Sequence, residues 1–169
     1  MEITINPEIS LLDQAKIQAQ VLVPLLETLR SELGDERANK LVTKALRDWS
    51  RDMFFRKAAL MPGGPKEKWE TLNAEAMPRI GTDVDFQLQK QEPEVIEFNI
   101  TGCRYADFFR ALGEPELGAV LLCEADNHIA QVGGPEVEFT RTQTIMEGAK
   151  NCDFRYRMKS GQGTKPADG

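Results

Sequence analysis

The chain is poor in the residues that mark several classes of protein. Its 169 residues include one histidine, three cysteines and two tryptophans, and no apolar stretch approaches the length that a membrane helix needs. The first residues, Met1 to Thr4, lack the basic region, apolar stretch and small-residue cleavage site of a secretory signal. We therefore expect a cytoplasmic protein without a membrane partner.

An excess of positive charge is also absent. The net charge is −6, and the basic residues alternate with acidic ones along the predicted helices. Nucleic-acid binding depends on clustered lysine and arginine, so no nucleic-acid partner is expected. With 41% apolar and 28% charged residues, the composition is that of an ordinary globular domain.

The three cysteines, Cys103, Cys123 and Cys152, cannot all pair within one chain. A cytoplasmic location favours free thiols, so they are interpreted first as thiols and then as metal ligands or reactive groups. The sequence has no C-x-x-C pair, and its zinc signal is therefore weak.

The first half of the chain has a helical pattern. Apolar residues recur at helical spacing and predict helices over residues 7–33, 35–59 and 66–77. Pro24 removes a backbone donor and crowds the preceding turn, so it is expected to kink or split the first helix. Pro78 is expected to end the third.

From residue 84 the apolar period changes from helical to alternating. Strands are predicted over 84–88, 95–100, 137–145 and 153–158, helices over 103–112 and 116–123, and a loop over 126–135. The predicted fold is a single α+β domain, residues 1–159, with N-terminal helices packed on a four-stranded, mainly antiparallel sheet. Residues 160–169 are predicted to be a disordered tail.

Cys103 lies where a strand is predicted to turn into a helix. Free backbone N–H groups and the helix dipole favour an anion there, so the pKa of this thiol is expected to be lowered and its thiolate to act as a nucleophile. Arg104 and Tyr105 follow, and the Arg104 guanidinium can bind a substrate carboxylate. The alternative is that Cys103 is a small buried residue in a tight corner.

Cys123 and Asp126 are three residues apart and would share one face of a helical turn. Asp126 is a candidate for activating water, or for binding a metal together with Cys123. The alternative is a core cysteine beside a solvated aspartate. His128 is expected in the nearby loop, either simply exposed or as a general acid or base.

Three threonines, Thr140, Thr142 and Thr144, alternate with Arg141 along a predicted strand and would share one face. Hydroxyls that face a core need polar partners, and a ligand can supply them. Thr142 and Thr144 are therefore candidate substrate contacts, whereas Arg141 would lie on the opposite face of the strand. The alternative is a threonine ladder that faces solvent.

Cys152 lies at the entry to the last predicted strand. If folding gathers Cys103, Cys123 and Cys152, they form either a three-thiolate metal site or a nucleophile with supporting thiols. No cofactor is firmly implied. A metal, if one is bound, is expected to be zinc or another thiophilic ion.

Several motifs in the second half occur together and in order. They are Thr101–Ala106, Leu112–Gly118, Cys123 with Asp126, Thr140–Gly148 and Cys152–Tyr156. In these motifs the chain resembles the L-2-amino-thiazoline-4-carboxylic acid hydrolase family, most strongly over residues 95–157. The resemblance implies hydrolysis of a C–N bond in a small cyclic amidine, which gives a carbamoyl amino acid.

On this resemblance, the Cys103 thiolate attacks the ring C=N carbon, Asp126 handles protons or positions water, and Arg104 or Arg141 binds the substrate carboxylate. In an alternative mechanism, a metal held by the three cysteines activates the attacking water. A weaker likeness, at the Gly-x-x-x-Cys-x-Phe pattern of 148–154, is to small-ligand-binding or sensor domains of the vinyl-4-reductase type. A degenerate family member that keeps only the fold is a third alternative. The expected partner is a small molecule, and a homo-oligomer stays open.

Overall fold

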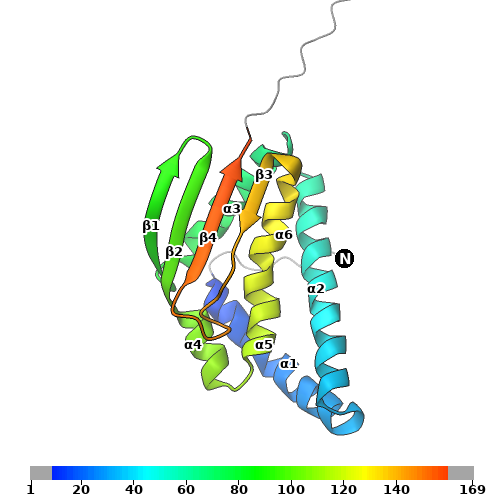
Figure 1. The fold of residues 1–169 in the computed structure, drawn as a ribbon. Coiled ribbons are helices and arrows are strands. Elements are labelled where there is room, and N and C mark those ends of the chain that lie inside the picture. The colour runs from blue at the N-terminus through cyan, green and yellow to red at the C-terminus, as the bar shows by residue number, and fades with distance from the viewer. Residues whose placement is uncertain (1–8, 160–169) are drawn as a thin grey trace, which may run out of the picture.

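A computed structural model of the chain describes residues 9–159 (Figure 1). The long helices α1 (Leu11–Leu33), α2 (Asp35–Ala59) and α3 (Pro65–Ile80) come first, and the hairpin strands β1 (Val84–Glu92) and β2 (Val95–Cys103) follow. The remaining elements are α4 (Arg104–Ala111), α5 (Pro115–Gly118), the π-helical turn η1 (Ala119–Cys123), α6 (Glu124–Val132), the 3-10 turn η2 (Gly134–Glu136), β3 (Val137–Thr140) and β4 (Cys152–Met158). The predicted tail, residues 160–169, lies outside the described residues, and the single domain over 1–159 stays a prediction.

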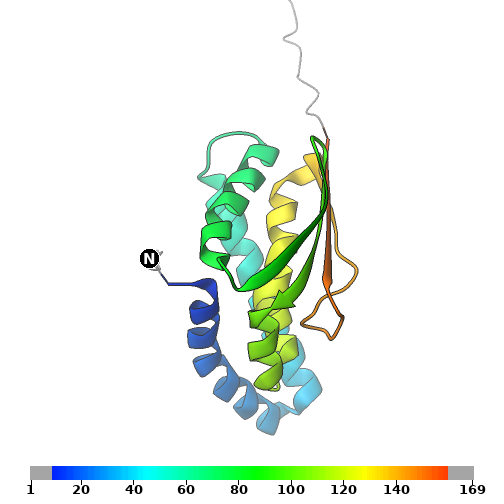
Figure 2. The same ribbon diagram turned by 90° about the vertical axis from the view of Figure 1, so that its left-hand side faces the viewer.

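The four strands form one antiparallel sheet in the order β1-β2-β4-β3. Seen edge-on in Figure 2, the sheet has the helices on one side. The predicted α+β fold, with N-terminal helices packed on a four-stranded antiparallel sheet, is therefore confirmed.

The face of the sheet that meets the helices is lined with apolar and aromatic side chains. Along β4, alternate residues are buried: Cys152, Phe154, Tyr156 and Met158. The ring of Phe98 on β2 stacks on that of Phe154, with centroids 4.7 Å apart. The opposite face carries ion pairs such as Arg157 with Glu97. The period-2 pattern of the sequence thus decides which face is covered.

Helix α1 begins later than predicted and is not split. Ser10 caps it, because its hydroxyl accepts a hydrogen bond from the backbone N–H of Asp13 at 3.0 Å. Pro24 lies inside the unbroken helix, and Figure 2 shows that α1 bends along its length. Similarly, α3 continues past Pro78 and ends at Gly81, which has a φ of 54° that suits glycine.

The predicted loop over 126–135 is wrong, because α6 extends to Val132. Asp126 and Asn127 are poor helix formers and suggested a loop. The next residues, however, bury His128, Ile129 and Val132 against the core, and this packing outweighs the local preference.

The predicted strand over 137–145 is wrong in its second half, because β3 ends at Thr140. The carboxylate of Asp153 accepts hydrogen bonds from the backbone N–H groups of Thr142 and Gln143, each at 2.9 Å. These donors are thereby diverted from the strand ladder.

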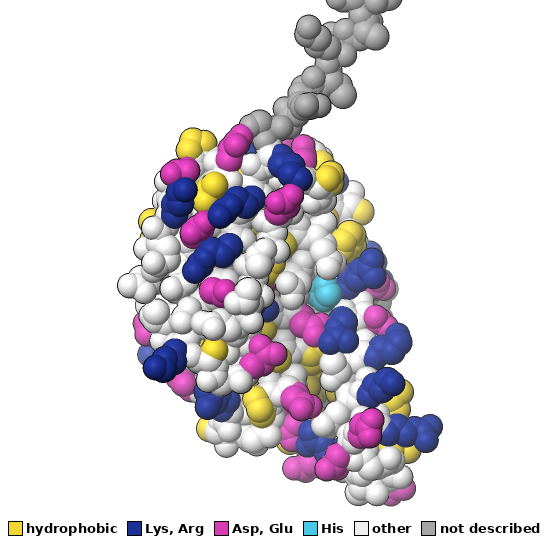
Figure 3. Space-filling model, in the orientation of Figure 1, with side chains coloured by type: hydrophobic (Ala, Val, Ile, Leu, Met, Phe, Trp, Pro, Cys, Tyr) yellow, Lys and Arg dark blue, Asp and Glu magenta, His cyan; other side chains and the backbone are white. Residues whose placement is uncertain are grey.

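No helix within residues 9–159 is long and apolar enough to span a membrane. On the face shown in Figure 3, lysine and arginine side chains are scattered among acidic ones rather than clustered.

Candidate functional site

The fold brings the three cysteines to one region of the helix–sheet interface. Cys103 ends β2, Cys152 begins β4, and Ile100 pairs with Cys152, so both thiols lie at the same end of the sheet. Cys123 is the last residue of η1 and packs, like Cys103, on the apolar cluster that contains Phe109. The three thiols do not line either of the two cavities described below, and the prediction that they share a cavity stays a prediction.

Cys103 occupies the N-cap position of α4. Its sulfur accepts a hydrogen bond from the backbone N–H of Ala106 at 3.4 Å. Burial nevertheless raises the pKa of the thiol, because desolvation outweighs the help of the Ala106 and Tyr105 N–H groups. The expected lowering of this pKa is therefore wrong. The sulfur lies at a helix N-terminus as predicted, but the effect of its burial on the pKa is larger than that of the helix N–H groups.

The other two thiols are protonated for the same reason. Burial raises the pKa of Cys123, and the negative charge of Asp126 adds to the effect. Burial also raises the pKa of Cys152, against the hydrogen bond that the Ile145 N–H donates to its sulfur at 3.2 Å. The region holds neutral thiols near neutral pH.

An ion pair joins this region to the end of β3. Arg141 Nη1 donates to Asp126 Oδ2 at 2.6 Å, and Nη2 donates to the carbonyl of Cys123 at 2.9 Å. The Arg141 side chain is 8% exposed, whereas that of Asp126 is 35% exposed. The guanidinium carbon also lies 5.2 Å from the ring centroid of Phe154. Arg141 thus fastens α6 to the sheet.

Asp126 has the most perturbed carboxyl of the region. Desolvation raises its pKa to about 6, although Arg141 opposes this by attraction and hydrogen bonding. A carboxyl with a pKa near 6 can exchange a proton close to neutral pH, which is a property of general acids and bases. Its charge acts on the pKa values of both Cys123 and Cys152.

The π-helical turn η1 sets the position of Cys123. Such turns insert one residue into a helix and are frequent at functional sites. Here the turn lies between α5 and α6, and its last carbonyl, that of Cys123, accepts from Arg141. Nothing in the sequence pattern signalled this turn.

Two predicted substrate contacts already have protein partners. The hydroxyl of Thr142 donates to Asp153 Oδ2 at 2.7 Å. Thr144 is buried, and its hydroxyl donates to Glu147 Oε2 at 2.6 Å. The predicted row of free hydroxyls is thus replaced by local capping of the segment that follows β3.

Arg104 and Tyr105 both approach Asp83, the residue before β1. Arg104 Nη1 lies 3.7 Å from Asp83 Oδ1, and the Tyr105 hydroxyl donates to Asp83 Oδ2 at 3.4 Å. Burial raises the pKa of Tyr105, with a further rise from the charge of Asp83. Asp83 itself was not singled out by the sequence.

His128 is not in an exposed loop. It is a buried residue of α6, and burial lowers its pKa, so the imidazole is neutral near neutral pH. A metal-binding cluster also fails to form: among residues 9–159, no group of three His, Cys, Asp or Glu side chains lies close enough to hold a metal ion.

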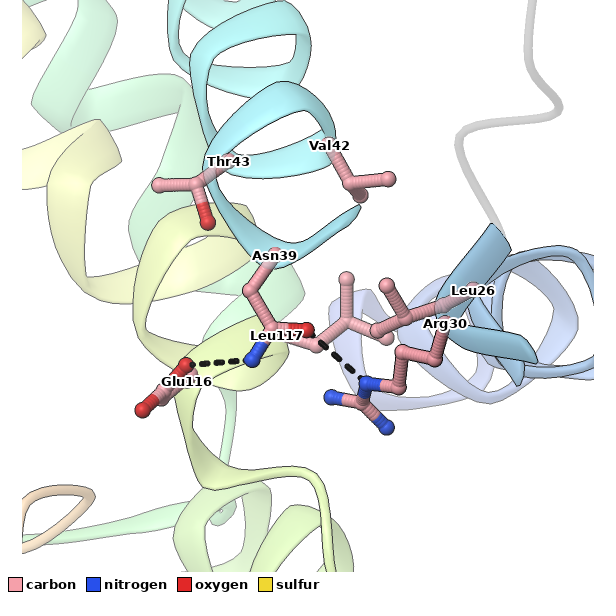
Figure 4. A pocket seen from close by; sticks show the side chains of 7 residues that line it. All are labelled: Leu26, Arg30, Asn39, Val42, Thr43, Glu116 and Leu117. Atoms are coloured by element: carbon pink, nitrogen blue, oxygen red, sulfur yellow. Dashed lines mark hydrogen bonds between the residues drawn. The ribbon is translucent and has the colours of Figure 1, made fainter. Parts of the chain in front are cut away.

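Two cavities differ greatly in size. The smaller cavity, shown in Figure 4, has a volume of about 10 Å³ and lies between α1, α2 and α5. Across it Arg30 Nε donates to Asn39 Oδ1 at 2.8 Å, and Asn39 Nδ2 donates to Glu116 Oε2 at 3.3 Å. A space of this size holds one water at most, so these residues serve packing.

The larger cavity has a volume of about 320 Å³ and lies between the start of α1 and the end of α3. It is lined by Ile9, Ser10 and the segment 78–83, which includes Arg79 and Asp83. This volume falls in the range of small-molecule sites. Cys103 does not line it but pairs with Val84, the residue that follows Asp83.

Comparison with known proteins identifies the family. The family model described as L-2-amino-thiazoline-4-carboxylic acid hydrolase matches residues 14–156, which is most of the chain. No curated protein matches the chain. The chain belongs to the L-2-amino-thiazoline-4-carboxylic acid hydrolase family.

Proposed function

We propose that the protein is a hydrolase that opens a small cyclic amidine of the 2-amino-thiazoline-4-carboxylate type to a carbamoyl amino acid. In the net reaction one water adds to the amidine carbon and one ring C–N bond breaks, so the product keeps every atom of the ring and the water. The observation that carries the proposal is that Cys103 and Cys123 pack on one apolar cluster, with Cys152 at the same end of the sheet as Cys103 and with a carboxyl of pKa about 6, that of Asp126, three residues after Cys123.

Cys103 is the nucleophile in this proposal. Its sulfur already accepts a backbone N–H of α4, and this donor can stabilise negative charge that develops on the sulfur. Its closest strand neighbour, Val84, follows the cavity residue Asp83. Cys123 and Cys152 have supporting roles as buried neighbours.

A neutral thiol suits a protonated amidine substrate, because the ring nitrogen becomes a basic amine once the sulfur adds to the amidine carbon, and this amine can take the thiol proton. The sulfur of Cys103 forms a bond to the amidine carbon, and the proton passes to the ring nitrogen. The ring C–N bond then breaks, and the carbon stays on the sulfur. Water adds to that carbon, and the Cys103 thiol leaves, which releases the carbamoyl product.

Asp126 handles the proton of the attacking water in this scheme. A carboxyl with a pKa of about 6 is ionised in most molecules at neutral pH and can accept that proton. Arg141 positions the Asp126 carboxyl through the 2.6 Å hydrogen bond. The Arg141 side chain is buried, so it is a weaker candidate for binding the substrate carboxylate. Arg104, whose side chain is 65% exposed, stays the candidate for contact with substrate among the residues that follow Cys103.

The test is turnover of 2-amino-thiazoline-4-carboxylate by purified protein, with the product identified by a mass gain of one water. Cys103→Ser is expected to abolish turnover, and Asp126→Asn to lower it by roughly 100-fold or more, the usual contribution of general acid–base catalysis. Asp52→Asn is the matched control, because Asp52 is an exposed aspartate of α2.

The non-catalytic alternative predicts a different result. If a panel of cyclic amidines, ureas and imides stays unopened while one compound raises the melting temperature, the chain is a binding module. If turnover depends on a stoichiometric metal that Cys123→Ser removes, the metal mechanism replaces the one proposed here.

A further inference from the structure

The cavity between α1 and α3 contains an arginine with unused binding capacity. Arg79 Nη2 donates to Gln14 Oε1 at 2.7 Å and, weakly, to the carbonyl of Ile9 at 3.5 Å. Its Nε is buried and has no hydrogen-bond partner. Within residues 9–159 the guanidinium has no carboxylate partner. A covered, unpaired donor is costly in a native structure unless a ligand or water satisfies it.

The same cavity contains a carboxylate that is poorly satisfied. The side chain of Asp83 is 12% exposed. Its polar contacts are long: 3.4 Å to the Tyr105 hydroxyl and 3.7 Å to Arg104 Nη1. An ionised carboxylate accepts about four hydrogen bonds, so Asp83 can accept more than these contacts supply.

Arg79 and Asp83 do not neutralise one another directly, since no ion pair joins them. A positive and a negative group therefore line one cavity of about 320 Å³ with capacity left on each. A ligand complementary to this arrangement carries a carboxylate for the guanidinium and a cationic, planar nitrogen group for the carboxylate. Both groups form charge-assisted hydrogen bonds with such partners.

We infer that this cavity is the binding site for a small zwitterionic amidine, with Arg79 holding the substrate carboxylate and Asp83 holding the protonated amidine. The inference rests on the proposed function and adds the recognition residues to it. Protonated 2-amino-thiazoline-4-carboxylate has both groups on one five-membered ring. Tyr105 contacts Asp83 and lies two residues after Cys103, so the hydrogen bond between Tyr105 and Asp83 connects this cavity to the segment that contains the thiol.

The test compares two probes that differ in one group: 2-amino-thiazoline-4-carboxylate and 2-amino-thiazoline, which lacks the carboxylate. Binding to the full chain is measured by calorimetry, and KM and kcat are measured for any probe that turns over. Arg79→Met is expected to weaken binding of the carboxylated probe by roughly 10- to 100-fold, as for loss of one charge-assisted pair, and to leave the other probe unchanged. Asp83→Asn is expected to weaken both probes.

Arg37→Met is the matched control, because Arg37 is an exposed arginine of α2 outside the cavity. A general loss of structure in Arg79→Met would weaken both probes equally, so a selective loss separates recognition from folding. Equal effects of Arg79→Met on the two probes would overturn the inference, as would a wild-type chain that binds neither.

Failure of this inference and failure of the proposed function give different results. If the wild type turns over the carboxylated probe and Arg79→Met leaves its KM unchanged, the cavity assignment is wrong and the hydrolase stands. If neither probe is hydrolysed but Arg79→Met selectively weakens binding of the carboxylated probe, the cavity assignment stands and the hydrolase proposal is wrong.

Discussion

Removal of the Arg141 guanidinium is expected to be the most damaging single change at the junction of α6 and the sheet. In Arg141→Met the carboxylate of Asp126 and the carbonyl of Cys123 lose their donors, at 2.6 and 2.9 Å in the structure. Breaking a buried pair by removing one partner costs about 3–5 kcal/mol. Methionine keeps much of the apolar contact with the nearby aromatic rings, so the loss reports mainly on the polar groups.

The expected magnitude is smaller than that range, because the Asp126 side chain is 35% exposed and water can solvate it in part. We expect a fall of about 2–4 kcal/mol in the free energy of unfolding by urea at neutral pH. For a domain of this size, this lowers Tm by roughly 5–15 °C.

Arg47→Met is the control for this measurement. Arg47 pairs with Glu124, two residues from Asp126 on the same helix, but its side chain is 48% exposed. Such a surface pair contributes about 0–1 kcal/mol. A loss in Arg141→Met below about 1 kcal/mol, or equal to that in Arg47→Met, would refute the structural role assigned to Arg141.

Three further predictions concern pH, thiol reactivity and packing. Burial raises the pKa of Asp126 from 3.8 to about 6, so the unfolded chain loses this proton at lower pH than the native protein does. The free energy of unfolding should therefore fall as pH rises from about 4 to about 6, and Asp126→Asn should remove this contribution in urea titrations. Parallel plots of the unfolding free energy against pH for the wild type and Asp126→Asn would contradict this. Because burial raises the pKa of all three thiols, iodoacetamide should label each far more slowly in the native protein than in urea near neutral pH; rapid native labelling of Cys103 would contradict this. In Gly118→Ala the new Cβ would lie 2.6 Å from Phe109 Cγ and 2.8 Å from Met146 Sδ, so a loss of about 1–3 kcal/mol is expected by urea unfolding; the exposed Ser31→Ala serves for comparison, and equal stabilities would show that the core adapts.

The fold could be predicted where hydrophobic period and strong breakers agree. The helical pattern of apolar residues that ends at Ala59 is followed by the segment Pro62–Pro65, which is rich in proline and glycine, and α2 ends at Ala59 in the structure. Strands β2 and β4 could be predicted because alternate residues pack on one core, such as Ile96, Phe98 and Ile100 of β2. Local preference failed at Asp126, where burial of the following residues keeps a helix, and after Thr140, where Asp153 from a later strand captures the backbone.

The candidate site could be predicted in part. Spacing and resemblance pointed to Cys103, Cys123 and Cys152, and the register of β2 with β4 brings two of them to one end of the sheet. The protonation state could not be predicted, because it depends on how deeply tertiary packing covers each sulfur.

Arg79 and Asp83 were missed for a different reason. They lie at the end of a helix and in a turn, where charged residues are normally solvated, and only the packing of α1 against α3 encloses them. No pattern within one element signals a cavity of that kind.

The most direct test of the catalytic claim is mass spectrometry of the whole protein after acid quench during turnover of 2-amino-thiazoline-4-carboxylate. The account predicts a protein species heavier by one substrate, with the added mass on the peptide that contains Cys103, and its absence in Cys103→Ser. Turnover that persists in Cys103→Ser, with no adduct in the wild type, would contradict it.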